Sequence, residues 1–409
     1  MCGIVGVTGI APALPLLLDG LSRLEYRGYD SAGVALVDEG AVWVRRRAGK
    51  LAELAAAVDD APVAASAGIG HTRWATHGRP SETNAHPHVD CTGHLALVHN
   101  GIIENHVELG DELEAAGHEL RSETDTEVLA HLVEQEMAAG KGLADAVRAS
   151  LRRVEGSFAV AVVCAAEPDL VVAARRGSPL IAGRTDDSTM VASDIPAILP
   201  STREIYVLED DQVVEARPGR LLVTSLDGVE VTPQRRHIPY DIEVAEKAGY
   251  ADFMLKEIHE QPQAIRETLR GRSRGGRLTL GEVQLSDDDL RAVDKVFIVG
   301  CGTSYHAGLV AKHAIEHWAR LPTQIDVASE FRYRSPVLDA QTLVIGVSQS
   351  GESLDTMEAC RFARSATNKA RVLAVCNVVD ASMAREADAV LYTRAGLEIG
   401  VAATKTHVA

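Results

Sequence analysis

Residues 1–9 read MCGIVGVTG and place a cysteine directly behind the initiator methionine, ahead of a short apolar run that we interpret as a strand. Removal of the methionine leaves Cys2 with both a thiol and a free α-amine. Such an amine titrates near pH ~8 and a free thiol near ~8.5, so the neutral amine can accept the thiol proton. Cys2 is therefore either a nucleophile that carries its own base or a small buried residue that begins a strand.

The same N-terminal stretch decides whether the sequence predicts a signal peptide or a membrane anchor. No Lys or Arg precedes the apolar stretch, and glycines and prolines interrupt it throughout: Gly3, Gly6, Gly9, Pro12 and Pro15. A signal peptide needs a basic start and an unbroken apolar helix, and a membrane span needs about 20 apolar residues. We expect strand, turn and helix instead, in a soluble protein without a membrane partner.

Composition narrows the class of protein further. The chain has 409 residues, enough for two domains, and a formal charge of −17 that argues against sequence-independent nucleic-acid binding. Its six cysteines form no Cys-x-x-Cys pair, which fits a reducing cytoplasm. Seven of the 15 histidines fall between His71 and His106, but the spacing of these seven gives no His-x-x-x-His pair on a helix, so we predict no metal site.

The sequence pattern changes along the chain and predicts two domains. Residues 2–236 alternate short β-rich runs with a few helices, which predicts sheets with helices packed on their outer faces. Residues 237–270 are charged and helical and are expected to connect two domains. Residues 271–409 alternate strands such as KVFIVG (295–300) and TLVIGVS (342–348) with helices, the pattern of a parallel sheet covered on both faces.

Several strings in the first part contain candidate site residues. HTRWATHG (71–78) contributes Arg73, and LALVHNGIIEN (95–105) contributes Asn100 and Gly101. SETDTE (122–127) places Asp125 at a predicted helix start. Each string also has a structural interpretation: an isolated Arg is usually solvated, Asn-Gly is typical of a hairpin turn, and an Asp at a helix start is typical of a cap.

Together with CGIVG and LEYRGYDSAG, these strings resemble the class II, or N-terminal nucleophile, glutamine amidotransferases, in the order of that family. The resemblance implies a four-layer αββα sandwich and release of ammonia from glutamine. It implies that Cys2 attacks the amide carbon and that Asn100 and Gly101 stabilise the oxyanion. It further implies glutamine-binding roles for Arg73, Thr76, His77 and Asp125.

A second candidate site lies in the C-terminal part. SQSGES (348–353) puts three hydroxyls in a tight turn between a strand and a helix N-terminus, where anions bind readily. Serine capping of the helix is the alternative. The string resembles the sugar-isomerase (SIS) domain, a flavodoxin-like unit that binds phosphosugars. The resemblance implies that fructose 6-phosphate contacts these residues: Thr303, Ser304, Ser348, Gln349, Ser350, Ser353 and Val401.

The order of the two domains resembles the family of glutamine–fructose-6-phosphate aminotransferases, from residue 2 to about 405. This implies transfer of glutamine nitrogen to fructose 6-phosphate, no cofactor, and a homodimer at full length. That family continues for a second SIS domain, absent here, which implies that glutamine hydrolysis needs only the first domain and that a truncated form acts as a glutaminase alone. A non-catalytic phosphosugar sensor is the alternative in which Cys2 has no role.

Overall fold

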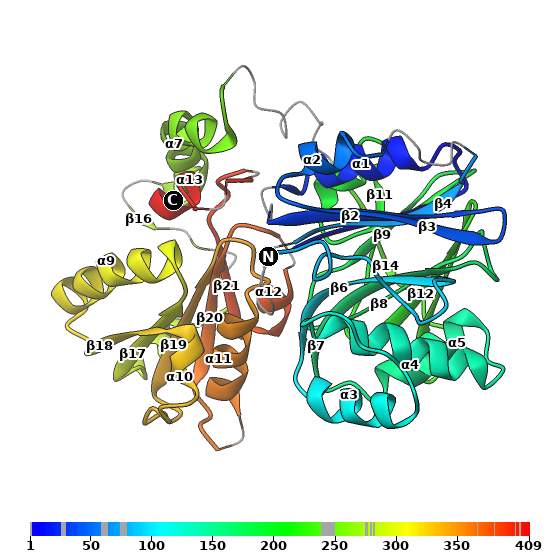
Figure 1. The fold of residues 1–409 in the computed structure, drawn as a ribbon. Helices are drawn as coiled ribbons and strands as arrows, with labels where there is room; N and C mark the ends of the chain where they lie inside the picture. Colours follow the sequence, from blue (N-terminus) through cyan, green and yellow to red (C-terminus); the bar gives the residue numbers. More distant parts are fainter. Residues whose placement is uncertain are drawn as a thin grey trace. The chain divides into compact units, whose positions relative to one another are not determined.

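The computed structural model describes residues 2–25, 30–58, 64–73, 80–238, 250–274, 277–278, 280, 283–365, 367–379, 381–396, 398–400 and 402–409. The chain divides into two compact units, residues 1–242 and 243–409 (Figure 1). Among the described residues, no helix is both long and apolar enough to cross a membrane.

Two antiparallel sheets form the first unit. The eight-stranded sheet has the order β14-β11-β9-β10-β1-β4-β2-β3. Its strands, in that order, are Gln234–His237, Glu204–Val207, Ile181–Arg184, Thr189–Ala192, Gly3–Thr8, Ala67–Arg73, Ser31–Asp38 and Ala41–Ala48. The six-stranded sheet has the order β13-β12-β8-β7-β6-β5. Its strands are Arg220–Ser225, Gln212–Arg217, Val171–Arg176, Gly156–Cys164, Leu95–Ile103 and His88–Val89.

Alternation along the strands explains how the two sheets stack. In β7, the alanines Ala159 and Ala161 face the other sheet, whereas Phe158 and Val160 face the helices on the outside. Successive side chains of a strand point to opposite faces, so a strand buried on both faces needs apolar residues at every position. The small side chains between the sheets allow them to approach closely.

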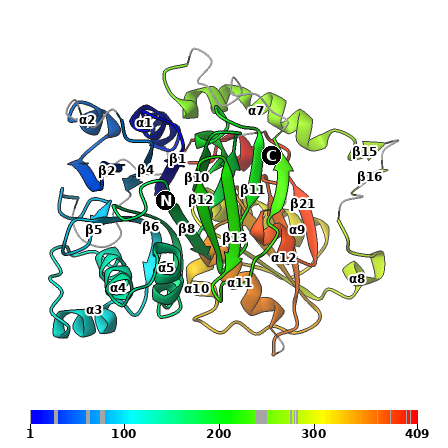
Figure 2. The ribbon, with the colours of Figure 1, turned by 90° about the vertical axis from the view of Figure 1, so that its right-hand side faces the viewer.

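Helices cover both outer faces, so the unit has four layers (Figures 1 and 2). Helix α1 (Leu14–Ser22) and α2 (Leu51–Ala55) pack on the eight-stranded sheet. Three helices cover the other sheet: α3 (His106–Ala115), α4 (Thr126–Ala138) and α5 (Leu143–Leu151). A 3-10 turn, η2, spans Ile195–Ala197. This is the αββα sandwich expected for the N-terminal nucleophile class.

The second unit contains a parallel sheet of order β18-β17-β19-β20-β21. Its strands are Thr323–Val327, Lys295–Gly300, Thr342–Ser348, Arg371–Cys376 and Ala389–Tyr392. Helix α9 (Thr303–Trp318) packs on one face. The other face carries α10 (Ala328–Phe331), α11 (Leu354–Arg364) and α12 (Ser382–Glu386). In chain order this arrangement is 2-1-3-4-5, the flavodoxin-like order that the sequence resemblance implied.

The remaining elements of this unit lie outside its sheet. A small antiparallel pair joins β15 (Ser273–Arg274) to β16 (Arg277–Leu278), followed by α8 (Asp287–Arg291). Helix α7 (Phe253–Leu269) packs against α13 (Lys405–Val408). The Glu257 carboxylate on α7 accepts hydrogen bonds from the backbone N–H groups of Ile399 and Gly400. The assignment of 237–270 as a connecting segment stays a prediction.

Candidate active site

The N-terminus enters the eight-stranded sheet next to the end of β4. Gly3 of β1 lies opposite Thr72 of β4, so the same register carries Cys2 toward Arg73. Arg73 is 4% exposed, and burial lowers the pKa of its guanidinium. The charges of Cys2, Asp125 and Asp30 oppose that effect and raise the pKa. The structure therefore brings Cys2, Arg73 and Asp125 into one electrostatic environment.

Asn100 reaches this site from the other sheet. Its Nδ2 donates a hydrogen bond to the main-chain oxygen of Cys2 at 3.1 Å. On its other side, Nε2 of His71 lies 2.9 Å from Asn100 Oδ1 and 3.1 Å from the main-chain oxygen of His99. Both neighbours are acceptors, so Nε2 carries the hydrogen. Burial lowers the pKa of His71 to about 3, and the ring is neutral at pH 7.

This pair of contacts fixes which way the amide of Asn100 points. His71 holds the oxygen, so the NH₂ group is turned toward Cys2. An asparagine NH₂ carries two hydrogens, and one of them suffices for the bond to the Cys2 oxygen. The second is available to a group that arrives beside the Cys2 thiol.

Gly101 follows Asn100 inside β6 rather than in a turn. Asn100 lies opposite Ala159 and Gly101 opposite Phe158 of β7, so the hairpin-turn interpretation is wrong. The φ angle of Gly101 is +136°, and a Cβ atom there would lie 2.1 Å from the main-chain oxygen of Ser157. Only glycine fits at a strand position with both this dihedral and this contact.

Asp125 precedes α4 but does not cap it. As the residue before the helix it makes no side-chain capping hydrogen bond. Instead, its Oδ2 accepts a hydrogen bond from the backbone N–H of Ile103 at 2.8 Å. The capping interpretation is therefore wrong. Asp125 is 5% exposed, and its carboxylate is aimed at the end of β6, close to Gly101 in the chain.

Sequence reasoning missed His71 as a site residue, although it lies in the quoted HTRWATHG string. Its ring stacks on that of His86 at 4.1 Å between centroids with 14° between the planes. Nδ1 of His86 in turn accepts a hydrogen bond from the backbone N–H of His99. The available signal was the spacing: residues two apart on a strand share a face, so His71 and Arg73 point the same way. Thr76 and His77 lie outside the described residues.

The second candidate site lies where the order of the parallel sheet reverses. The chain leaves β17 into α9 at Thr303 and leaves β19 at Ser348, and β17 and β19 are neighbours. Ligands of such sheets bind at this crevice, outside the carboxyl ends of the strands. Here the structure has a cavity of about 130 Å³, lined by Thr303, Ser304, Ser348 and Gln349 among others.

Hydroxyls organise the loop beside this cavity. The Ser348 and Ser353 Oγ atoms lie 3.0 Å apart, and Ser348 Oγ also accepts a hydrogen bond from the backbone N–H of Gly351 at 3.1 Å. Ser350 Oγ accepts one from the N–H of Glu352 at 3.2 Å. Ser353 precedes α11 without a side-chain capping bond, so plain capping does not explain it.

Sequence reasoning missed part of the cavity lining. Asn377 and Thr393 contribute to the wall and are joined by a 2.9 Å hydrogen bond from Thr393 Oγ1 to Asn377 Oδ1. They follow β20 and β21, so the fold brings them to the same edge of the sheet as Ser348. No local motif marks them. Val401 lies outside the described residues.

Comparison with known proteins gives the same two domains. The model of a glutamine amidotransferase domain matches residues 71–200, and that of a SIS domain matches residues 289–409. Glutamine–fructose-6-phosphate aminotransferase [isomerizing] of Mycobacterium bovis is 53% identical over 420 residues, covering 100% of this chain and 67% of the relative. The Streptomyces coelicolor protein of that name is 53% identical over 410 residues, covering 100% and 66%.

Among solved structures, the C-terminal domain of glucosamine-fructose-6-phosphate aminotransferase from Francisella tularensis is 40% identical, with a TM-score of 0.37. It covers 40% of this chain and 45% of that one. The chain spans about two thirds of the length of the bacterial relatives named above. On these identities and this coverage, the chain belongs to the glutamine–fructose-6-phosphate aminotransferase family.

Proposed function

We propose that the first unit hydrolyses glutamine with Cys2 as the nucleophile. The α-amine of Cys2 takes the thiol proton, and the sulfur attacks the side-chain amide carbon of glutamine to form a tetrahedral oxyanion. The C–N bond then breaks, the amine returns the proton to the departing nitrogen, and ammonia leaves a thioester. Water hydrolyses the thioester to give glutamate and restores the thiol.

The orientation of Asn100 is the observation that carries this proposal. Its NH₂ group points to Cys2 because His71 binds the opposite end of the amide. A donor fixed in advance beside a nucleophile can stabilise an oxyanion without reorganisation, which is typically worth about 3 kcal/mol per donor. The backbone N–H of Gly101 is the second donor that we assign to this role.

The two buried charges near Cys2 suit the ends of free glutamine. The guanidinium of Arg73 matches an α-carboxylate in the bidentate geometry that arginine favours. Asp125 supplies a carboxylate for the α-ammonium. One buried positive group and one buried negative group in the same site select the zwitterion of free glutamine over a glutamine side chain within a peptide. By the family match we also assign Thr76 and His77 to this pocket.

For the second unit we propose that fructose 6-phosphate binds at the crevice between β17 and β19. The loops that begin at Thr303 and Ser348 supply hydroxyls and backbone N–H groups, the donors that phosphates and sugars use. We assign Ser304, Gln349, Ser350, Ser353 and Val401 to the same site. Glutamine nitrogen transferred to this sugar yields the amino sugar phosphate that defines the family.

We also propose that the chain pairs with a second copy through its second unit. Among the strongly exposed apolar or aromatic side chains of this unit are Val310 at 69%, Trp318 at 80% and Tyr333 at 72%. Exposed apolar side chains of this kind become buried when two copies of a chain associate. Light scattering of the wild type and of Trp318→Glu tests this, and a wild-type monomer at high concentration would contradict it.

The glutaminase proposal is tested by glutamate release from the wild type, Cys2→Ala and the matched control Cys301→Ser. We expect Cys2→Ala to lose activity to the background rate and Cys301→Ser to keep it, because Cys301 lies in the second unit. Mass spectrometry of products formed with fructose 6-phosphate tests nitrogen transfer. Equal rates for the wild type and Cys2→Ala would leave only a phosphosugar-sensing role.

A further inference from the structure

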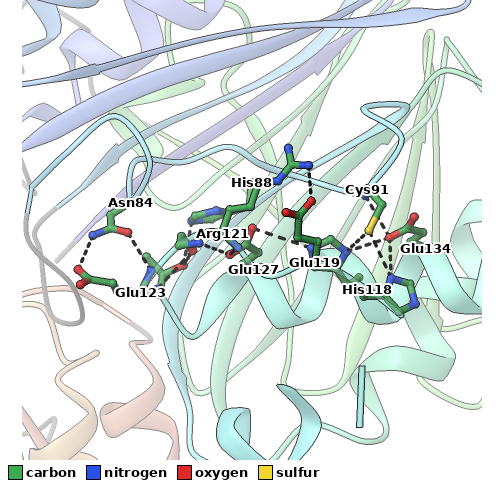
Figure 3. A network of polar contacts seen from close by, with 12 residues as sticks. Asn84, His88, Cys91, His118, Glu119, Arg121, Glu123, Glu127 and Glu134 are labelled. Atoms are coloured by element: carbon green, nitrogen blue, oxygen red, sulfur yellow. Dashed lines mark hydrogen bonds and ion pairs between the residues drawn. The ribbon is translucent and has the colours of Figure 1, made fainter. Parts of the chain in front are cut away.

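Four metal-binding side chains converge on the first unit, away from Cys2. Cys91 lies in the turn between β5 and β6, and His118 follows α3. His131 and Glu134 are three residues apart on α4 and so share one helix face. Figure 3 shows Cys91, His118 and Glu134 turned toward one another. The four donor atoms all lie within 4.8 Å of one another.

The fold brings these donors to distances close to the edges of a tetrahedral zinc site, and the two S–N distances fit best. Cys91 Sγ lies 3.7 Å from His118 Nδ1 and 3.5 Å from His131 Nδ1. Ordinary zinc bond lengths give a tetrahedron an S–N edge of about 3.6 Å and an N–O edge of about 3.3 Å. Glu134 Oε2 lies 3.0 Å from His118 Nδ1 and 2.9 Å from His131 Nδ1.

The surroundings of His131 resemble those of a metal-bound histidine. Its Nδ1 faces the cluster, and its Nε2 faces Glu127 Oε1 at 3.9 Å. Metal-binding histidines commonly turn their other nitrogen to a carboxylate, which fixes the ring. Glu127 is itself held by the backbone N–H groups of Arg121 and Ser122, at 2.9 and 2.6 Å. The His131 side chain is only 2% exposed, so the ring has little freedom to turn away.

We propose that Cys91, His118, His131 and Glu134 bind one Zn²⁺ ion in a closed, structural site. A thiolate, two imidazoles and a carboxylate are all zinc ligands, and four protein donors leave no open position for substrate. Binding displaces the thiol proton to solvent as the Zn–S bond forms, so the site fills more readily as pH rises. The spacing of the histidines did not reveal the site, because its donors come from three segments of the chain.

The position of the site gives the ion a structural role. Cys91 ties down the turn before β6, the strand that carries Asn100 and Gly101. His131 and Glu134 tie down α4, which begins directly after Asp125. Zinc therefore connects the two elements that carry the oxyanion donors and the proposed ammonium-binding carboxylate. A closed structural ion of this kind takes no part in the proposed chemistry at Cys2.

The test is metal binding by the full chain. After purification without chelators and incubation with zinc, the wild type should contain one zinc per chain by elemental analysis. With Co²⁺ in place of zinc, it should show a thiolate-to-cobalt charge-transfer band in the near ultraviolet and tetrahedral d–d bands in the visible. Cys91→Ser should lose the charge-transfer band, and His131→Gln should weaken Co²⁺ binding at least tenfold.

Matched controls separate this site from other donors. Cys301→Ser removes a thiol of the second unit, and His94→Gln removes an exposed imidazole of the same turn. Both should bind Co²⁺ like the wild type, and so should Cys2→Ala. The proposal is overturned if the wild type gives no charge-transfer band with excess Co²⁺. It is equally overturned if the band survives in Cys91→Ser or disappears in Cys2→Ala. The wild-type spectrum decides even where a variant fails to fold.

Discussion

Replacing Asn100 with alanine separates the proposed chemistry from the fold. The substitution removes the NH₂ group that lies 3.1 Å from the Cys2 main-chain oxygen and leaves the nucleophile unchanged. Loss of one oxyanion donor typically costs about 2.7–4 kcal/mol of transition-state stabilisation, or about 10²–10³ in kcat. Because the donor acts on charge that develops during reaction, KM for glutamine should change little.

The structure predicts a smaller effect of Asn100→Ala on stability, through the loss of two hydrogen bonds: Asn100 Nδ2 to the Cys2 oxygen and His71 Nε2 to the Asn100 oxygen. His71 Nε2 loses the Asn100 oxygen at 2.9 Å but keeps the His99 oxygen at 3.1 Å, so the buried ring retains an acceptor. At about 1 kcal/mol for each of the two lost hydrogen bonds, the cost is about 2 kcal/mol, which lowers Tm by about 4–8 °C in a unit of this size.

The assay is glutamate release at saturating glutamine, with kcat and KM measured separately and Tm recorded for each variant. Asn105→Ala is the control, since Asn105 follows the same strand and bonds the Arg153 oxygen and the Glu155 N–H. It should lose stability and keep kcat. A kcat for Asn100→Ala within threefold of the wild type, or a loss confined to KM, would refute the role of Asn100.

Three further predictions follow from other contacts. Asp125→Asn keeps an acceptor for the Ile103 N–H but removes the buried charge, so KM for glutamine should rise about 30-fold or more with Tm nearly unchanged; an unchanged KM in steady-state kinetics would contradict this. Ser348→Ala removes the acceptor of the Gly351 N–H, and calorimetry should show fructose 6-phosphate binding weakened at least about tenfold; an equal Kd would refute the assignment. Burial lowers the pKa of His71 to about 3, so between pH ~6.5 and ~3 only the unfolded state takes up this proton. As the pH is lowered through this range, the free energy of unfolding should therefore decrease by up to about 1.4 kcal/mol per pH unit. Urea unfolding at several pH values should show a weaker pH dependence of this free energy for His71→Gln, and an equal pH dependence would argue against the neutral ring.

Patterns of apolar residues predicted the architecture because both units bury their strands on two faces. The runs GSFAVAVVCAA and TLVIGVS could be interpreted as strands directly, and β7 (Gly156–Cys164) and β19 (Thr342–Ser348) occupy them. Strictly alternating strands and helices likewise predicted the parallel sheet. These signals are local in sequence, and each position reports the environment of its own side chain.

Interpretation from neighbouring residues alone was wrong where a residue contacts another part of the chain. Asn-Gly at 100–101 has the composition of a turn, but the pair continues β6 because Gly101 lies against the Ser157 oxygen of β7. Asp125 has the position of a cap, but its carboxylate binds the Ile103 N–H. In both cases a contact across the fold determines the conformation, and such contacts are invisible in a short window of sequence.

The same limit explains the residues that sequence reasoning did not find. His71 acts on Asn100 across the two sheets, and the proposed zinc donors come from a turn, a helix end and a helix face. Only the resemblance to a family linked the distant strings of the active site. It assigned roles to particular motif positions and gave none to His71, although His71 is the first residue of the HTRWATHG string.

The central claim is that the α-amine of Cys2 activates the thiol of the same residue. Its most direct test is expression with methionine aminopeptidase inhibited, followed by intact-mass spectrometry and glutaminase assays on preparations with different fractions of retained Met1. The account predicts that kcat per chain rises in proportion to the fraction that begins at Cys2 and extrapolates to zero for the fully retained form. A chain that keeps Met1 and hydrolyses glutamine at the full rate would contradict it.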